Sequence, residues 1–189
     1  MRKLLLLRPE PGLSSSVERA RNLGLEVIAC PLFRIEPVKW SVPDPVEYDG
    51  LLLTSANAVR QAGGGLEQLI QLPAHAVGEA TARVARESGL SVETVGDDDI
   101  VSLLAMLPPD VRLLHLAGED HRDPGDARID RRIVYRSATI TNPALPKLEG
   151  LVAAIHSPRA GSRLAELGTQ RRRPAIAAIS APAADACGD

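Results

Sequence analysis

Short apolar runs alternate with segments of helical periodicity along most of the chain. The first run covers residues 3–7 and the second covers 26–30, and between them the serines at 14–16 predict the N-cap of a helix that ends at Leu23. Similar runs recur at 50–54, 75–77, 91–95, 111–116, 151–156 and 174–179. Most are continuous rather than alternating, which is typical of strands covered on both faces. The pattern therefore predicts an α/β fold with parallel sheets and right-handed crossovers.

Two stretches depart from this pattern, residues 31–38 and 132–140. Both have an extended, partly alternating character and are flanked by prolines or polar residues. They either pair as a two-stranded connector between two lobes or form ordinary edge strands, and the pattern leaves both alternatives open. Between them, residues 120–130 contain Pro124 and Gly125 and lack apolar periodicity, so we expect a loop in place of a crossover helix.

The chain also shows internal similarity. Three predicted strand-to-helix turns each have a counterpart later in the chain: residues 7–10 resemble 116–119, residues 54–57 resemble 156–159, and residues 77–82 resemble 179–184. The last two pairs have the same spacing, which suggests that one α/β unit was duplicated. We therefore expect two similar lobes that enclose a cleft.

These turns are the natural places for chemistry, because ligands of parallel sheets bind beyond the carboxyl ends of the strands, near the free amides of helix N-termini. The hydroxyls of Ser55 and Ser157, with the amides that follow them, suit a carboxylate or a phosphate. Both serines are equally explained as plain helix N-caps. Arg8 and Arg159 are candidates for charge-assisted bonds to such an anion, with solvated surface arginines as the alternative.

Composition and charge narrow the classes of function. The formal charge is −2, so no global field attracts nucleic acid or an anionic membrane, and an anionic ligand must be bound locally. Only 2% of the residues are aromatic, which argues against stacking on bases. The leucines at 4–7 form a run too short for a signal segment or a membrane span. We expect a cytoplasmic protein with no nucleic-acid or membrane partner.

Several motifs of known chemistry are missing. The glycines at 63–65 are not part of a nucleotide-binding motif, and the sequence contains neither HExxH nor GxSxG. The four histidines have no metal-ligand spacing. Cys30 and Cys187 stand alone and are expected to be small buried side chains. We expect no metal site and no disulfide.

Seven short motifs, taken in order, carry a resemblance to a known family: RPEP at residue 8, PL and IEP in the segment from residue 31, TSANAV at 54, AVGEATA at 76, IVYR at 133, HSPRAGS at 156 and AISAPAA at 178. Their order and spacing resemble the uroporphyrinogen-III synthase family over nearly the whole chain. The resemblance implies two α/β lobes joined by a two-stranded hinge, with a substrate cleft between them. The first lobe would contain residues 1–35 and 140–189, and the second would contain residues 36–139.

The resemblance implies a lyase that closes hydroxymethylbilane, a linear tetrapyrrole, into uroporphyrinogen III while it inverts the terminal ring. The family's reaction uses no metal and no organic cofactor. The substrate is then a small polycarboxylate and the protein is expected to be a monomer. A second hypothesis is a non-catalytic, two-lobed module that binds a tetrapyrrole or another anion.

The resemblance also implies site residues. Tyr135, in IVYR, would assist departure of the substrate hydroxyl, and the alternative is that it only packs beside the hinge. The implied substrate-binding residues are Arg8, Thr54, Ser55, Asn57, Gly78, Thr81, Ser157 and Arg159.

The sequence departs from the family pattern in three places. A crossover helix is expected where residues 120–130 predict a loop. In the turn near residue 180, Ser180 and Ala183 stand where glycine and threonine are expected. Members of the family normally continue with a strand and a helix after the position of Asp189, so either this sequence is truncated or the first lobe is incomplete.

Overall fold

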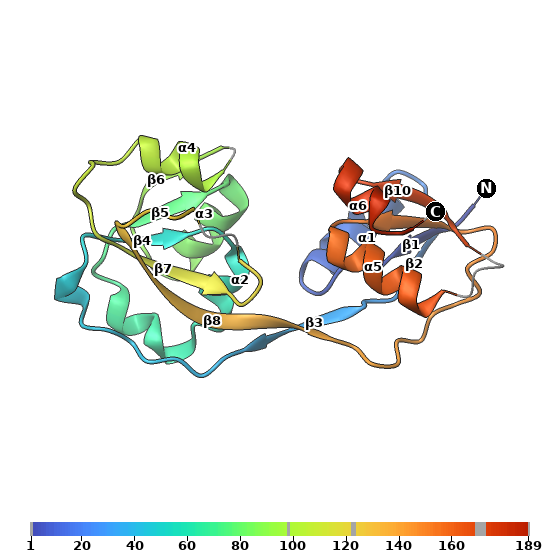
Figure 1. Ribbon diagram of the computed structural model, residues 1–189, viewed down its shortest axis with the longest axis horizontal. Coiled ribbons are helices and arrows are strands. Elements are labelled where there is room, and N and C mark those ends of the chain that lie inside the picture. Colours follow the sequence, from blue (N-terminus) through green and yellow to red (C-terminus); the bar gives the residue numbers. More distant parts are fainter. Residues whose placement is uncertain (1, 98, 122–123, 169–172, 189) are drawn as a thin grey trace. The chain divides into compact units, whose positions relative to one another are not determined.

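The chain forms two compact units. The computed structural model describes residues 2–97, 99–121, 124–168 and 173–188. Unit 1 is made of Met1–Arg34 and Ala138–Asp189, and unit 2 is Ile35–Ser137 (Figure 1). Because unit 1 is assembled from both ends of the chain, the chain passes between the units twice.

Both passages lie in strands of an antiparallel pair, β3 (Phe33–Pro37) and β8 (Ile129–Thr139). The amide of Val38 donates to the carbonyl of Val134, and the amide of Ile140 donates to the carbonyl of Leu32, each over 2.9 Å. The prediction that both segments are extended is confirmed, although β8 begins three residues earlier than expected. β3 is also the edge strand of a larger sheet.

Unit 2 contains a six-stranded sheet in the order β3-β8-β7-β4-β5-β6, parallel from β8 to β6. Its other strands are β4 (Gly50–Leu53), β5 (Ala74–Val77), β6 (Val92–Gly96) and β7 (Leu113–Gly118). Its α-helices are α2 (Ala56–Gln61), α3 (Glu79–Glu87) and α4 (Ile100–Ala105), and one-turn 3-10 helices cover Pro45–Glu47, Gly63–Gly65 and Glu67–Leu69.

Successive residues of a strand point to opposite faces of the sheet, and unit 2 buries apolar side chains on both. On one face Leu51 and Leu53 of β4 belong to the cluster that contains the buried side chains of α2 and α3. On the other face Leu52 packs with Leu103 and Leu104 of α4. The central strands therefore need apolar residues at every position, which explains the continuous apolar runs in the sequence.

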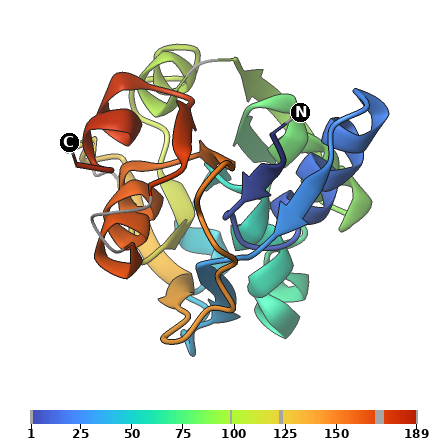
Figure 2. The ribbon, with the colours of Figure 1, turned by 90° about the vertical axis from the view of Figure 1, so that its right-hand side faces the viewer.

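Unit 1 contains a four-stranded parallel sheet in the order β10-β9-β1-β2. The strands are β1 (Leu4–Leu6), β2 (Val27–Ala29), β9 (Val152–Ile155) and β10 (Ala175–Ala178), and the helices are α1 (Gly12–Asn22), α5 (Pro158–Leu167) and α6 (Ala181–Asp185). Helices α5 and α6 lie together over β9 and β10, apart from α1, which contacts β1 and β2 (Figure 2). Cys30 and Cys187 are buried, free thiols of this core, as predicted.

Helix α1 corrects one prediction from the sequence. The helix begins at Gly12, before the serines that were expected to form its N-cap. The carboxylate of Glu10 accepts hydrogen bonds from the amide of Ser14 (3.0 Å) and from its hydroxyl (2.8 Å). Glu10 therefore satisfies the amide of Ser14, while the amides of Leu13 and Ser15 donate to the backbone carbonyls of Pro9 and Pro11, and no serine acts as the N-cap.

The strand order repeats between the units. The row β8-β7-β4-β5 of unit 2 corresponds to the row β2-β1-β9-β10 of unit 1. The three pairs of similar turns follow β7 and β1, β4 and β9, and β5 and β10, so each pair occupies the same place in its sheet. This topology supports the duplication inferred from the sequence. In unit 2 the row continues with β6, whereas the described residues of unit 1 contain no equivalent strand.

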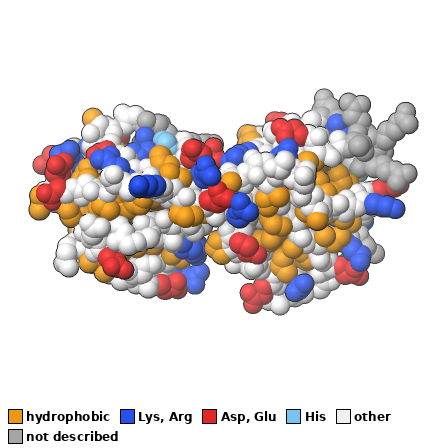
Figure 3. Space-filling model, turned by 90° about the horizontal axis from the view of Figure 1, so that it is seen from below, with side chains coloured by type: hydrophobic (Ala, Val, Ile, Leu, Met, Phe, Trp, Pro, Cys, Tyr) orange, Lys and Arg blue, Asp and Glu red, His pale blue; other side chains and the backbone are white. Residues whose placement is uncertain are grey.

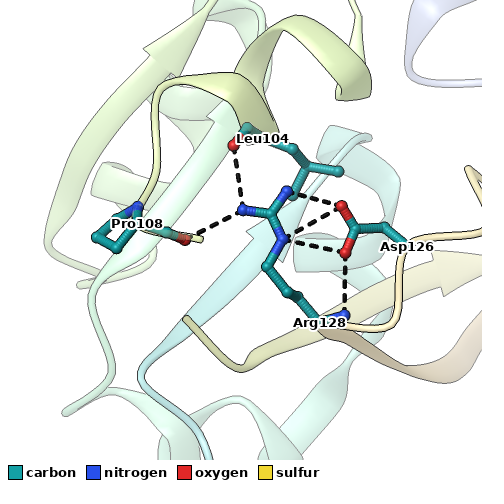
Figure 4. Close-up of polar contacts among 4 residues, drawn as sticks. All are labelled: Leu104, Pro108, Asp126 and Arg128. Atoms are coloured by element: carbon teal, nitrogen blue, oxygen red, sulfur yellow. Dashed lines mark hydrogen bonds and ion pairs between the residues drawn. The ribbon is translucent and has the colours of Figure 1, made fainter. Parts of the chain in front are cut away.

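The connection between β7 and β8 is a loop, as predicted, and its described residues, 119–121 and 124–128, form no helix. The guanidinium of Arg128 joins this loop to the segment at the end of α4 (Figure 4). Arg128 pairs with Asp126 (2.7 Å) and donates to the carbonyls of Leu104 (3.3 Å) and Pro108 (3.1 Å) near the end of α4. The charged side chain thus ties the loop to two carbonyls at and after the end of α4, each of which also accepts a backbone hydrogen bond.

The hydrogen bonds from Arg128 lower the pKa of Asp126 below its ordinary value of 3.8. The ion pair therefore contributes fully to stability above that value. Its contribution is lost as the pH falls through the lowered pKa.

Replacing Arg128 by Met should lower the free energy of unfolding of unit 2 by about 1–3 kcal/mol, because partly buried acceptors lose a charged donor. Trp40, the only tryptophan, lies in unit 2, so its fluorescence in urea measures this change. Arg83→Met is the matched control, since its pair with Glu87 is exposed and is worth at most about 0.5 kcal/mol. Equal midpoints for the two variants would contradict the role of Arg128.

Candidate functional site

The strand order of each unit marks one place for a ligand. In unit 2 the chain runs outward from β4 to β5 and β6, then returns to β7 on the other side of β4. In unit 1 the direction changes in the same way between β9 and β1. At such a reversal the connections leave in opposite directions, and ligands bind at the carboxyl ends of the two strands.

Ser55 lies directly beyond the reversal in unit 2. It is the N-cap of α2, and its hydroxyl oxygen accepts a hydrogen bond from the amide of Asn57 (3.2 Å). Thus the N-cap alternative for Ser55 is confirmed. The cap also brings Asn57, the second residue of the helix, to this edge of the sheet.

Thr54 precedes this cap and is linked to the neighbouring strand. Its hydroxyl oxygen lies 2.9 Å from Nε2 of His115 on β7, so the contact crosses the reversal. His115 is only 1% exposed, and its Nδ1 accepts a hydrogen bond from Nε of Arg131 on β8 (3.4 Å). Neither residue was predicted from the sequence, because a lone histidine in an apolar strand and an arginine in the polar first half of β8 carry no recognisable spacing.

Gly78 and Thr81 belong to the next turn, after β5. Gly78 caps α3 with φ of 80°, a conformation that glycine adopts without strain. Thr81 is 6% exposed, and its amide donates to the carbonyl of Gly78. At this turn the side chain of Thr81 is therefore buried, and the backbone at Gly78 is the more exposed part.

Tyr135 lies against the end of β7. The pairing of β7 with β8 shifts register here, so that Gly118 faces Tyr135. A Cβ atom added to Gly118 would lie 2.5 Å from Cζ of Tyr135 and 2.8 Å from its hydroxyl oxygen. The ring is partly buried and also packs against the main core of unit 2. Only a glycine lets the phenol reach the carboxyl edge in this way, which the sequence analysis did not anticipate.

In unit 1, Ser157 follows β9 and caps α5, with its hydroxyl oxygen 3.2 Å from the amide of Ala160. Arg8 follows β1, the strand next to β9, and donates to the hydroxyl of Ser16 (3.2 Å). Burial, together with the charge of Arg8, lowers the pKa of His156 below its ordinary value. The imidazole beside Ser157 therefore favours its neutral form.

Arg8 is held close to its own turn. A Cβ atom on Gly12 would lie 2.6 Å from Nε of Arg8, so the absence of a side chain there lets the guanidinium pass over the start of α1.

Arg159 takes a different position from Arg8. Its guanidinium lies 4.6 Å from the ring centre of Phe33, a cation–π contact, and 3.5 Å from the hydroxyl of Thr139. The side chain is exposed but rests on the segments that carry the chain between the units. Of the predicted arginines, only Arg8 lies directly at the strand reversal of unit 1.

The predicted residues form two sets, one in each unit. In unit 2, Thr54, Ser55, Gly78 and Tyr135 lie at the carboxyl ends of adjacent strands. In unit 1, Arg8 and Ser157 follow the neighbouring strands β1 and β9.

The surface and the described side chains limit what these sets can bind. On the face drawn in Figure 3, acidic and basic side chains are interspersed on each unit. Among the described residues, no group of three or more His, Cys, Asp and Glu side chains is placed to hold a metal ion. None of the helices in the described part of the chain is long and apolar enough to span a membrane.

Parallel sheets with hydroxyl-capped turns at their strand reversals define an α/β protein whose candidate ligand sites lie at the carboxyl ends of its strands. The chain belongs to the uroporphyrinogen-III synthase family, since the family model described as uroporphyrinogen-III synthase HemD matches residues 14–189. A uroporphyrinogen-III synthase of Chlorobaculum parvum is 30% identical over 119 residues, which is 58% of this chain and 48% of that protein. A putative uroporphyrinogen-III synthase of Archaeoglobus fulgidus is 33% identical over 85 residues, 43% of this chain and 34% of that protein. The chain thus spans half or less of the length of these relatives.

The fold is similar to a solved one. A mutant uroporphyrinogen III synthase of Thermus thermophilus superposes with a TM-score of 0.57 and 22% identity, over 97% of this chain and 87% of that one. At this level of identity the likeness concerns the fold.

Replacing Gly118 by Ala should displace the Tyr135 ring, because the new methyl group would overlap the phenol. We expect a loss of about 1–3 kcal/mol in the free energy of unfolding. A crystal structure of the variant measures the displacement, and Trp40 fluorescence measures the stability. Gly64→Ala is the control, because a Cβ atom there meets nothing within 4 Å. An unmoved ring in Gly118→Ala would show that the glycine does not determine its position.

Proposed function

We propose that the chain is a uroporphyrinogen-III synthase, which closes hydroxymethylbilane and inverts its terminal ring without a metal or an organic cofactor. The observation that carries this proposal is the position of the family motifs. The residues of RPEP, TSAN, VGEAT, IVYR and HSPR lie at the carboxyl ends of β1, β4, β5, β7 and β9 or directly against them. A family whose motifs coincide with the ligand edge of both sheets supports shared chemistry.

In this proposal the two units are the two lobes, β3 and β8 are the hinge, and the substrate binds in a cleft between the lobes. The lobes would contain residues 1–35 with 140–189, and residues 36–139. The antiparallel pairing of β3 with β8 supports the hinge, because it is the place where the chain passes between the units.

The carboxylates of the substrate would be bound by local donors. The net charge of −2 gives no general attraction, so each carboxylate needs its own hydrogen bonds. Arg8 supplies a charged fork, and the first turns of α3 and α5 supply amides and the positive end of a helix dipole. Thr54, Ser55, Asn57, Ser157 and Arg159 would add side-chain contacts, and Gly78 and Thr81 would shape a backbone site.

Tyr135 would help the hydroxyl group leave. Its phenol O–H can donate a hydrogen bond to the departing oxygen. Departure of that hydroxyl gives an azafulvene. The far pyrrole then attacks at its substituted α carbon, and the spiro intermediate breaks and closes again with that ring reversed.

The main task of the protein is to control conformation. The open tetrapyrrole also closes in water without inversion, so the lobes must hold it such that the less accessible carbon reacts. We propose that the protein does so as a monomer in the cytoplasm, with no nucleic-acid or membrane partner.

The second candidate is a binding module without turnover. One observation favours it: the described part of the β7–β8 connection lacks a helix. A lobe changed in this way would bind the substrate without directing its closure.

Freshly generated hydroxymethylbilane separates the two candidates, with the type I and type III products resolved after oxidation. We expect type III product from the wild-type protein. Type I product alone, at the rate seen without protein, would sink the synthase proposal and support the binding module.

Tyr135→Phe should lower kcat by about 10²-fold or more, the usual range for a lost proton donor, with little change in KM. Tyr48→Phe is the matched control, since it removes a phenol that bonds to Asp130 rather than one at the end of β7. A Tyr135→Phe enzyme as fast as wild type would remove the assigned role.

A further inference from the structure

A chain of three polar side chains crosses the sheet of unit 2 at the strand reversal. Arg131 of β8 faces His115 of β7 in the strand register, and Nε of Arg131 donates to Nδ1 of His115 over 3.4 Å. On its other side, Nε2 of His115 lies 2.9 Å from the hydroxyl oxygen of Thr54, directly after β4. The imidazole is 1% exposed, so solvent does not compete for these contacts.

The guanidinium determines which ring nitrogen carries the proton. Arginine only donates hydrogen bonds, so Nδ1 of His115 must offer its lone pair to Arg131. The proton of the imidazole is then on Nε2, and Nε2 donates to the hydroxyl oxygen of Thr54. Because this oxygen accepts from the ring, its own hydrogen points away from His115.

We propose that Arg131 and His115 are positioning residues that hold the Thr54 hydroxyl as a hydrogen-bond donor to a carboxylate of the substrate. The inference rests on the proposed function, since it assigns a role within the same site. Thr54 is half-buried at the carboxyl end of β4, where the strand order reverses, so its hydroxyl lies at the edge of the sheet where a ligand would bind. A carboxylate accepts such a hydrogen, whereas a cation does not.

Comparison of the two repeated units supports a specific role for Thr54 and His115 in unit 2. In the repeated turn of unit 1, His156 stands where unit 2 has Thr54, and Leu6 of β1 stands where unit 2 has His115 of β7. The hydroxyl and the histidine that orients it are therefore both present in one unit and both replaced in the other. Unit 2 gains a neutral, oriented donor that unit 1 lacks.

The protonation of His115 can be measured in the free protein. Long-range ¹H–¹⁵N spectra of protein labelled at its four histidines, at pH 8, should show Nε2 of His115 protonated and Nδ1 unprotonated. The signals are assigned by their loss in His115→Gln. A proton on Nδ1 would overturn the proposal, because the ring would then accept from Thr54 and consume its hydrogen.

Kinetics with hydroxymethylbilane test the consequence. His115→Leu removes the donor to Thr54 and should raise KM about tenfold, the cost of one misdirected hydrogen bond to a charged group, with a smaller change in kcat. His115→Gln should restore KM to within about threefold of wild type, because its amide nitrogen can replace Nε2 as the donor. Thr54→Val should behave like His115→Leu, and Thr54→Ser like wild type.

His75→Leu is the matched control. His75 is also a buried histidine on a parallel strand of this sheet, and burial lowers its pKa, but it lies on β5 beside Gly50. This variant changes stability without touching Thr54, so its KM should stay that of the wild type.

The outcomes separate the two proposals. Type III product from the wild type with an unchanged KM in His115→Leu would refute the positioning role and leave the proposed function intact. A wild-type protein that makes no type III product would refute the proposed function, and the assigned role of Thr54 would fall with it.

Discussion

Parallel strand pairing is the constraint on which the rest of this structure depends. Because β4, β5, β7 and β8 run in one direction, the residues after β4, β5 and β7 all emerge at one edge of the sheet of unit 2. The same holds for β1, β9 and β10 in unit 1. Turns that are far apart in the sequence, such as those at Thr54 and Gly118, are thereby brought to neighbouring positions. The positions of the site residues that we propose depend on this arrangement.

The same constraint would let a weakly acidic protein bind the polyanion that we propose as its substrate. A parallel sheet leaves the first amides of its helices unpaired at the ligand edge, so the binding strength would come from local dipoles and a few charged side chains. Buried polar groups need hydrogen-bond partners within the protein. In His115, one ring nitrogen contacts Arg131 and the other contacts Thr54. In the proposed site, the aliphatic strands would exclude water, and the hydroxyl groups and Arg8 would give specificity.

The sequence predicted the parallel strands other than β8 from their continuous apolar runs between turns. It predicted β8 as extended but not its place inside the sheet, parallel to β7. It also predicted the β7–β8 loop, the caps at Ser55 and Ser157, and the repeated turns. It missed contacts that depend on register: Gly118 matters only because a shift brings Tyr135 opposite it, and Arg131 only because it pairs with His115. The predicted start of α1 was wrong because the helix begins at Gly12 after Pro11, and Ser14 lies inside it with its amide bonded to the side chain of Glu10.

The most direct test of the account is where a tetrapyrrole carboxylate meets the protein. Backbone amide spectra recorded during titration with uroporphyrinogen III, under reducing conditions, report this residue by residue. We predict that the largest shifts fall at residues 54–57, 78–81, 118–119 and 157–160, the carboxyl ends of the strands in both units. Shifts concentrated at the opposite ends of the strands, near residues 49–50 and 90–92, would contradict it.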